Sequence, residues 1–330
     1  MLCVQLTKSN AEEDRITLSL TIYNTQNNPM ASNKQEWLDA FTHLRLQFSL
    51  LLMPVYLFAL SQTIIVSYVN ALLVFIILHV LVYPASNIFN SYYDTDQGSV
   101  GGLKSPPPSN KRMLWIANIF DTAALTLSLL LTVEFNVLLL CYILASRLYS
   151  YKPIRLKKYP YMGLIIIFIF QGGFTYYMTT YGVFVLNTST QHLSEFFLSG
   201  IRINDIYFAL LATSFQIGAV YPLTQIYQHK SDLADGVTTL SYTLGYRGTF
   251  LFSGVMFGIA TLFYYLHFEQ TDITSFYLFT IAQIPIIGYF VYWASKVWKN
   301  TKYADYKHTM YMNTIAALVL NLFFIYLVIT

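Results

Sequence analysis

Residues 71–94 read ALLVFIILHVLVYPASNIFNSYYD, and their character changes halfway along the stretch. The first half is almost entirely apolar and contains no Asp, Glu, Lys or Arg, whereas the second half carries hydroxyls, amides and a final carboxylate. A helix needs about 20 mainly apolar residues to cross the hydrocarbon of a bilayer. The stretch therefore predicts a membrane-spanning helix whose far end reaches a polar site.

The composition of the whole chain points the same way. Of 330 residues, 55% are hydrophobic, 17% are aromatic and only 11% are charged. An ordinary soluble domain carries about 25% charged residues, so this composition excludes a typical soluble enzyme and predicts an all-α polytopic membrane protein. The same length rule predicts a bundle of nine transmembrane helices, near residues 46–66, 69–93, 112–133, 135–151, 161–186, 204–229, 243–267, 273–297 and 308–329.

The first part of the chain differs from the rest. Residues 1–43 are polar and aperiodic, and they predict a cytoplasmic tail with a short surface helix near residues 35–41; residues 44–330 are predicted to form the membrane domain. The first apolar run begins too late and is too long for a signal peptide. The two cysteines, Cys3 and Cys141, support no disulfide framework.

The basic residues indicate how the bundle is oriented. Nine spans divide the connecting segments into two sets, and all of the 19 Lys and Arg residues except Arg45 and Arg202 fall in the tail or in the loops of one set. Because basic loops stay on the cytoplasmic side, this bias predicts a cytoplasmic N-terminus. The loops that follow the second, fourth, sixth and eighth spans are then cytoplasmic as well.

Part of the opening stretch recurs later in the chain. Residues 83–94 (YPASNIFNSYYD) match residues 221–232 (YPLTQIYQHKSD) in Tyr, Pro, Ile and Asp, and several other pairs are chemically alike. Such self-similarity suggests an internal structural repeat. At about 100° per residue, each copy places its polar residues on one helix face: Tyr83, Asn87, Asn90 and Asp94 in the first, and Tyr221, Gln225, Gln228 and Asp232 in the second.

These polar stripes predict a ligand site at the cytoplasmic ends of two helices. Amides and carboxylates at membrane depth face the bundle interior or a wet cavity, and a carboxylate at a helix C-terminus is disfavoured by the helix dipole unless a cation compensates it. Oxygen ligands favour a hard ion such as Mg²⁺, which commonly binds together with phosphates. The stripes predict Asp94 and Asp232 as metal ligands.

Basic and glycine-rich loops lie on the same predicted face. Glycines at 98, 101 and 102 let the backbone approach a ligand, and Lys104 offers a point charge suited to a phosphate oxygen. The loop after the fourth span adds Arg147, Tyr151 and Lys157. Acidic, amide and basic groups are therefore expected to converge where the cytosol meets the bilayer.

With these motifs the chain resembles the UbiA superfamily of intramembrane prenyltransferases from roughly Arg45 to its end. The family pattern Asn-Asp-x-x-Asp-x-x-x-Asp falls on residues 90–98, and Asp-x-x-x-Asp-x-x-x-Gly, followed by Thr-Leu, falls on residues 228–240. Residues 148–157 are similar to the family's basic loop. Of the five carboxylates in the two family patterns, Asp94 and Asp232 are kept, while Ser91, Gly98 and Gln228 stand at the other positions.

The resemblance implies transfer of an isoprenyl group from a polyprenyl diphosphate to a hydrophobic acceptor, with Mg²⁺ as cofactor. Its expected partners are that donor, an acceptor of unknown identity and membrane lipids, with no nucleic acid. It adds Asp96 and Asp235, from the adjoining loops, to the metal ligands Asp94 and Asp232. The expected catalytic residues are Asp94, Asp232, Lys104 and Tyr151. The expected substrate-binding residues are Asn87, Asn90, Gln225, Gln228, Tyr83, Tyr221, Arg147 and Lys157.

Two other functions stay open from the sequence. The three changed carboxylates favour a membrane protein that binds an isoprenoid or lipid diphosphate without catalysis. Parallel internal repeats also occur in transporters, although transporter sites usually lie near the bilayer midplane rather than at helix ends. Asp121, inside the third predicted span, is equally compatible with a pocket residue and with a contact between helices.

Overall fold

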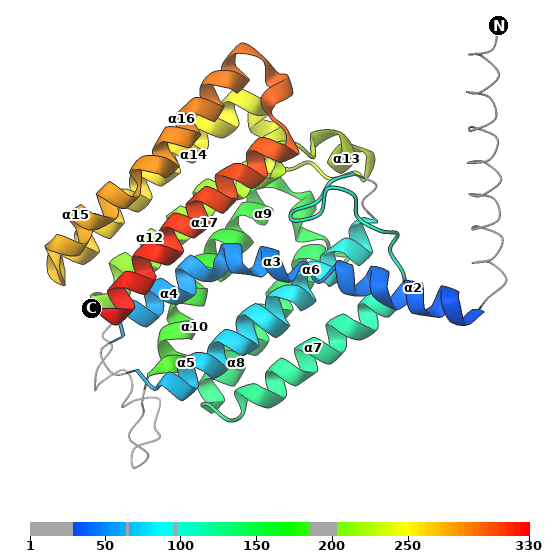
Figure 1. The fold of residues 1–330 in the computed structure, drawn as a ribbon, viewed down its shortest axis with the longest axis horizontal. Helices are drawn as coiled ribbons and strands as arrows, with labels where there is room; N and C mark the ends of the chain where they lie inside the picture. Colours follow the sequence, from blue (N-terminus) through cyan, green and yellow to red (C-terminus); the bar gives the residue numbers. More distant parts are fainter. Residues whose placement is uncertain (1–28, 64–65, 96–97, 185–202) are drawn as a thin grey trace, which may run out of the picture.

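The computed structural model describes residues 29–63, 66–95, 98–184 and 203–330, and within these ranges the chain is an assembly of helices (Figure 1). The notation η marks 3-10 helices, except that η2 and η4 are π-helical. The elements are α2 (Pro29–Thr42), α3 (Leu46–Ser49), η1 (Leu50–Leu52), α4 (Met53–Ser61), α5 (Tyr68–Phe75), η2 (Ile76–Val82), α6 (Tyr83–Asp94), α7 (Arg112–Ser128), α8 (Val133–Ser150), η3 (Leu156–Lys158), α9 (Pro160–Ile167), η4 (Phe168–Gly173), α10 (Phe174–Val183), α12 (Ile203–Gln225), α13 (His229–Ala234), α14 (Leu240–Gln270), α15 (Ile273–Ala282), α16 (Ile284–Lys299), η5 (Thr301–Tyr303) and α17 (Tyr306–Ile329).

The predicted all-α membrane fold is confirmed. Among the described residues, eight helical runs are long and apolar enough to span a bilayer. α7 has 17 residues, at the lower end of the range that can span, and it corresponds to the predicted third span. The structure thus has about the nine helices that were expected, and the predicted spans overlap α4, α5–α6, α7, α8, α9–α10, α12, α14, α15–α16 and α17.

The described part of the chain begins with the helix α2, in the region where the sequence predicts a short surface helix. α2 includes residues 35–41 and lies outside the main bundle in Figure 1. It ends before Arg45, whose backbone is left-handed with φ 49°, and α3 begins at the next residue. The left-handed residue breaks the helix because L-residues cannot continue a right-handed helix from that conformation. Residues 1–28, the greater part of the predicted tail, lie outside the described residues.

The two copies of the repeat fold differently. Tyr83–Asp94 is one regular helix, α6, as expected. In the second copy α12 ends at Gln225, and Asp232 lies in the separate short helix α13, so the prediction of one continuous helical stripe is wrong there. Local hydrogen bonds explain the break. The Thr224 hydroxyl donates to the Tyr221 carbonyl, and the Gln228 backbone N–H donates to the Gln225 carbonyl, which forms a tight turn.

An aromatic core holds the end of the bundle away from these motifs. Phe58 of α4 is fully buried, and the rings of Tyr176, Tyr264 and Phe324 lie 4.9–5.1 Å from it. The Tyr264 hydroxyl donates to the Gln216 side chain at 2.5 Å. Tilted aromatic pairs at these distances contribute beyond the burial of their surface. This cluster joins α4, α10, α14 and α17 and fixes the walls between which the site lies.

Close packing of η4 against α12 depends on Gly172. A Cβ atom built on Gly172 would lie 2.4 Å from the Ser214 Cα, a backbone contact that no rotamer change can relieve. Gly172→Ala is therefore expected to destabilise the protein by about 1–3 kcal/mol, the usual cost of overpacking, and to lower its thermal midpoint in detergent. The matched control is Gly258→Ala in α14, where nothing lies within 4 Å of the added methyl; an equal loss in both variants would contradict the explanation.

Candidate active site

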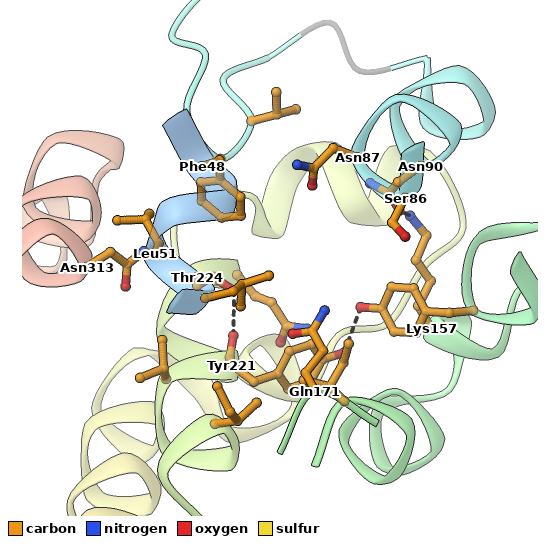
Figure 2. A pocket seen from close by; sticks show the side chains of 18 of the residues that line it. Phe48, Leu51, Ser86, Asn87, Asn90, Lys157, Gln171, Tyr221, Thr224 and Asn313 are labelled. Carbon is orange, nitrogen blue, oxygen red and sulfur yellow. Dashed lines mark hydrogen bonds between the residues drawn. The ribbon is translucent and has the colours of Figure 1, made fainter. Parts of the chain in front are cut away.

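One cavity of about 290 Å³ opens at the end of the bundle where both repeat motifs lie. Its polar walls come from α6, from the loop after α8, and from α12 and α13; its apolar walls come from η1, α4, η4 and α17. Figure 2 shows amide and basic side chains along one side of the space and Leu51 and Asn313 along the other. A cavity with a charged side and an apolar side suits a ligand with a polar head and a hydrocarbon tail.

A cluster of ion pairs lies at the polar wall. Arg155 donates from Nη2 to Asp94 Oδ1 at 2.9 Å and to Asp235 Oδ2 at 2.8 Å, while the Lys157 ammonium pairs with Asp94 Oδ2. The side chains of Arg155 and Asp94 are 8% and 9% exposed. Arg155 thus links Asp94 at the end of α6 to Asp235 just after α13, and so joins the two segments that carry the family patterns.

The electrostatics of Arg155 follow from its carboxylate partners. Burial alone lowers the pKa of this guanidinium, but the hydrogen bond to Asp235 and the charge and hydrogen bond of Asp94 outweigh burial, so the pKa of Arg155 is raised. The backbone of Arg155 is left-handed, with φ 46°, at the position just before η3. Arg155 therefore carries a permanent positive charge in the cavity wall.

The amides of the two motifs tie the surrounding loops together. Asn90 Oδ1 accepts hydrogen bonds from the Ser150 hydroxyl at 2.7 Å and from Lys157 Nζ at 2.8 Å. Gln225 Oε1 accepts from the Ser241 backbone amide at 3.1 Å, and Gln228 Nε2 donates to the Ser99 carbonyl at 3.2 Å. The last bond fastens the loop after α6 to the segment after α12.

Tyrosine rings complete the wall below the charged groups. The hydroxyls of Tyr149 and Tyr221 lie 3.1 Å apart, and Lys157 Nζ lies 5.9 Å from the centre of the Tyr149 ring. Both tyrosines, together with Tyr227, line the cavity. Electron-rich faces next to a cation-binding wall stabilise positive charge.

The structure brings together most of the residues proposed from the sequence. Nine of them line the cavity: Asn87, Asn90, Asp94, Lys157, Tyr221, Gln225, Gln228, Asp232 and Asp235. Four do not: Tyr83, Lys104, Arg147 and Tyr151. Asp96 lies outside the described residues. The roles of all these residues stay predictions, and only their placement is now known.

The four residues off the cavity have other surroundings. The Arg147 guanidinium pairs with Asp121 and lies 3.9 Å above the Phe89 ring, between α6, α7 and α8. Tyr83 is buried with its ring 4.9 Å from His79. Tyr151 is 40% exposed and Lys104 is exposed. Asp121 thus forms the contact between helices that was one of its two expected roles.

The cavity residues that the sequence analysis did not name as site candidates include Arg155, Tyr149 and Asn313. Arg155 stands two residues before Lys157 in the same basic loop, but residue order does not reveal which cation turns inward. Asn313 is an amide inside the last apolar span. The rule that drew attention to Asp121, that a polar side chain in a span is a functional candidate, would have selected it too.

The donor groups at this wall fit a hard divalent cation. Asp94, Asp232 and Asp235 line one cavity with several amide oxygens, and Mg²⁺ is usually bound by one or two carboxylates together with substrate phosphates. Within the described ranges, no three His, Cys, Asp or Glu side chains are grouped closely enough to hold a metal by themselves. The arrangement therefore fits a metal that shares its ligands with a phosphate.

His229 lies beside the second motif but away from the cavity. Its Nε2 is 2.8 Å from the Ser241 hydroxyl, and its ring stacks on Tyr246 with centroids 4.7 Å apart. Burial lowers the pKa of His229 to about 4. The unfolded chain, with a His pKa near 6.5, then binds this proton first, so folding stability is expected to fall as the pH drops from about 6.5 to 4.

Thermal unfolding in detergent at pH 7.5 and pH 4.5 checks this expectation. The loss of melting temperature between the two pH values should be smaller in His229→Gln, which keeps a polar partner for Ser241 but has no proton to gain. An identical pH dependence in the wild type and the variant would show that His229 does not contribute.

Comparison with known proteins adds independent findings. A family model described as "UbiA prenyltransferase family" matches residues 51–315. A UbiA homologue from Archaeoglobus fulgidus bound to DMAPP and Mg²⁺ is 16% identical and has a TM-score of 0.63; the match covers 88% of this chain and 99% of that one. No curated protein matches the sequence significantly.

Two further solved structures share the fold. A digeranylgeranylglyceryl phosphate synthase structure is 18% identical with a TM-score of 0.56, and the match covers 90% of this chain and 100% of that one. The apo structure of a UbiA homologue from Aeropyrum pernix K1 is 15% identical with a TM-score of 0.60, and the match covers 87% and 98% of the two chains. At these identities the likeness establishes the fold and leaves the reaction to be argued from the site.

Proposed function

The chain belongs to the UbiA prenyltransferase family, and on that premise we propose that it transfers an isoprenyl group from a polyprenyl diphosphate to a hydrophobic acceptor at the cytoplasmic membrane face. The observation that carries the proposal is the cavity itself. Three carboxylates and the cations Arg155 and Lys157 line one side of it, and apolar side chains line the other. A polyprenyl diphosphate needs both surfaces, a charged one for its diphosphate and an apolar one for its isoprenoid chain.

Arg155 and Lys157 would bind the diphosphate. Each cation pairs with Asp94 in the cavity wall, so a phosphate oxygen of the entering diphosphate would replace an Asp94 oxygen as the partner of that cation. Charge-assisted hydrogen bonds from Arg and Lys to phosphate are strong and directional. Asn90, which accepts from Lys157, keeps that ammonium near the cavity during the exchange.

In the proposed reaction the bond between the allylic carbon and the diphosphate oxygen breaks, and the diphosphate leaves with the electron pair. The acceptor supplies a new electron pair to the allylic carbon and loses a proton to water at the cavity mouth. Tyr149 and Tyr221 would stabilise the positive charge that develops on the isoprenyl group. Mg²⁺, held by Asp94, Asp232 and Asp235, would neutralise the leaving diphosphate.

The solved relatives support a divalent metal and a prenyl diphosphate. Structures of the A. fulgidus homologue are described as bound to DMAPP and Mg²⁺, to GPP and Mg²⁺, and to Cd²⁺. The placement of the site on the cytoplasmic side rests on the distribution of Lys and Arg among the loops.

A metal-dependence assay tests the proposal. The purified protein in detergent is incubated with geranyl diphosphate and Mg²⁺, with and without candidate acceptors, and released diphosphate is measured. EDTA is expected to reduce the release to background, and excess Mg²⁺ to restore it. Absence of metal-dependent release with every acceptor and with donors of several chain lengths would refute the enzyme.

A second candidate function is diphosphate binding without turnover. The residue Ser91, where the family pattern has a carboxylate, is 1% exposed, and its hydroxyl oxygen has no hydrogen-bond partner in the described part of the chain. A carboxylate missing from this position lowers the number of metal ligands available. This alternative predicts tight binding of geranyl diphosphate that survives both Asp94→Asn and Asp232→Asn, with no diphosphate release by the wild type.

A further inference from the structure

A groove of about 420 Å³ lies on the surface of the molecule, between α2 and the first turns of α7. Its lining residues are Glu36, Trp37, Lys111, Arg112, Trp115 and Ile119. None of them lines the cavity of the candidate active site. The charged residues lie at the start of α7, and Ile119 lies about 10 Å further along that helix than Arg112, at a rise of about 1.5 Å per residue. The groove thus has a charged end and an apolar end.

α2 is fixed against α7 by polar and apolar contacts. Arg112 Nε donates to the Glu36 carboxylate at 2.9 Å, and Asn110 Nδ2 donates to the Glu36 carbonyl, also at 2.9 Å. Ala40 and Leu44 of α2 are buried in one cluster with residues of α6 and α7. Figure 1 shows α2 beside the start of α7 and outside the main bundle. The two walls of the groove are therefore held together by contacts of the fold itself.

A different face of α2 exposes large apolar side chains. Trp37, Leu38 and Phe41 are all exposed, and at about 100° per residue they fall within an arc of about 100°. Trp115 and Ile119 continue this surface onto α7, and Trp115 is 69% exposed. Tryptophans at the end of a membrane-spanning helix, next to an amphipathic surface helix, are typical of the membrane–water interface. Lipid is therefore the natural cover for this surface.

The charged end of the groove carries an excess of positive charge. Arg112 pairs with Glu36, and its guanidinium lies 4.9 Å from the centre of the Trp37 ring. Lys111 is exposed, and no carboxylate within the described ranges forms an ion pair with it. Two cations and one carboxylate line the groove, which leaves one net positive charge. Lys34 is also exposed, on the same side of α2 as the apolar arc.

We propose that this groove binds one anionic phospholipid, with the phosphate at Lys111 and an acyl chain along Trp115 and Ile119. An anionic headgroup matches the net charge of the groove, whereas the quaternary ammonium of a zwitterionic phosphatidylcholine would meet the unpaired lysine. The apolar end of the groove continues along a membrane-spanning helix, as an acyl chain does. The proposal goes beyond prenyl transfer and does not depend on it.

Native mass spectrometry of the full chain tests the proposal. Protein freed of lipid in detergent is titrated in separate samples with dioleoyl phosphatidylglycerol and dioleoyl phosphatidylcholine, which share their acyl chains and differ in headgroup charge. The dissociation constant of the first bound lipid is measured for each. The wild type is expected to bind phosphatidylglycerol about fivefold more tightly, the factor that one lysine near an anionic lipid contributes. Lys111→Gln should abolish this preference.

The matched control is Lys299→Gln. Lys299 is an exposed lysine at the end of α16 and lines neither the groove nor the active-site cavity, so its replacement changes the net charge equally at another place. This variant should keep the preference of the wild type. Both lysine side chains are exposed, so both variants are expected to melt with the wild type in lipid-free detergent. Phosphatidylglycerol should raise the melting temperature more than phosphatidylcholine in the wild type and in Lys299→Gln, but not in Lys111→Gln.

Trp115→Ser tests the apolar end of the groove. It should weaken the binding of both lipids by similar factors and leave the headgroup preference in place, because it removes contact with the acyl chain alone. Unchanged affinity of this variant for both lipids would overturn the placement of the chain. A wild type without headgroup preference, as expected if a second copy of the protein or another part of the chain covers the groove, overturns the proposal. A preference kept in Lys111→Gln, or lost equally in Lys299→Gln, does the same.

Discussion

In a variant carrying Asp94→Asn, diphosphate release from geranyl diphosphate is expected to fall about 100-fold or more. Asp94 is the carboxylate on which the site converges, because it pairs with both Arg155 and Lys157 and lies on the cavity wall. The neutral amide keeps the size of the side chain but removes one charge that orients the two cations and would hold the metal. Loss of a single group that stabilises charge in a transition state typically costs a factor of 10²–10³.

The control for this prediction is Asp305→Asn. Asp305 caps α17, where its carboxylate accepts from the His308 amide at 2.8 Å, and it does not line the cavity. The amide can still accept this hydrogen bond, so release should stay within about twofold of the wild type. If Asp94→Asn retained most of the wild-type release, the assignment of the active site to this cavity would be wrong.

Asp121→Leu is expected to destabilise the protein by about 3–5 kcal/mol without a direct effect on the cavity. The change leaves the Arg147 guanidinium, whose side chain is 17% exposed, without its carboxylate partner between α7 and α8. Removal of one member of a buried ion pair has this cost because the remaining charge stays desolvated. Thermal unfolding in detergent measures the loss.

The double variant Asp121→Leu with Arg147→Met provides the test of mechanism. Replacing both charges by apolar groups of similar size should recover most of the stability, since a buried ion pair contributes little net stability compared with good apolar packing. The same double variant addresses the substrate-binding role predicted for Arg147. Unchanged affinity for geranyl diphosphate would assign Arg147 to structure, and a large loss would support its predicted role in binding.

The fold could be predicted well because it is determined mainly by the length and spacing of apolar runs along the sequence. Apolar runs of the right length occur nine times, and each overlaps a helix or helix pair of the structure. The breaks inside those runs were not predictable in the same way. The π-helical turns Ile76–Val82 and Phe168–Gly173 and the end of α12 at Gln225 depend on local hydrogen bonds and on packing against other helices, which periodicity does not encode.

The sequence predicted which segments form the candidate site better than it predicted which side chains of those segments line the cavity. Residues on a regular helix, such as Asn87, Asn90 and Asp94, line the cavity as expected from their angular positions. Loop residues depend on backbone conformation instead. Arg155 reaches the cavity from a left-handed residue, whereas Arg147, on the preceding helix, turns toward Asp121. The sequence analysis selected Arg147 and not Arg155, whereas the tertiary contacts place Arg155 at the cavity and Arg147 beside Asp121.

The charged residues that line the cavity have a thermodynamic consequence. Among the described residues they are three cations, Arg45, Arg155 and Lys157, and three carboxylates, Asp94, Asp232 and Asp235, so the wall is formally neutral. A diphosphate that entered alone would leave a large net negative charge in a poorly solvated space. Entry together with a divalent cation removes most of that charge. Donor and metal should therefore show positive linkage, each raising the affinity for the other by the same factor.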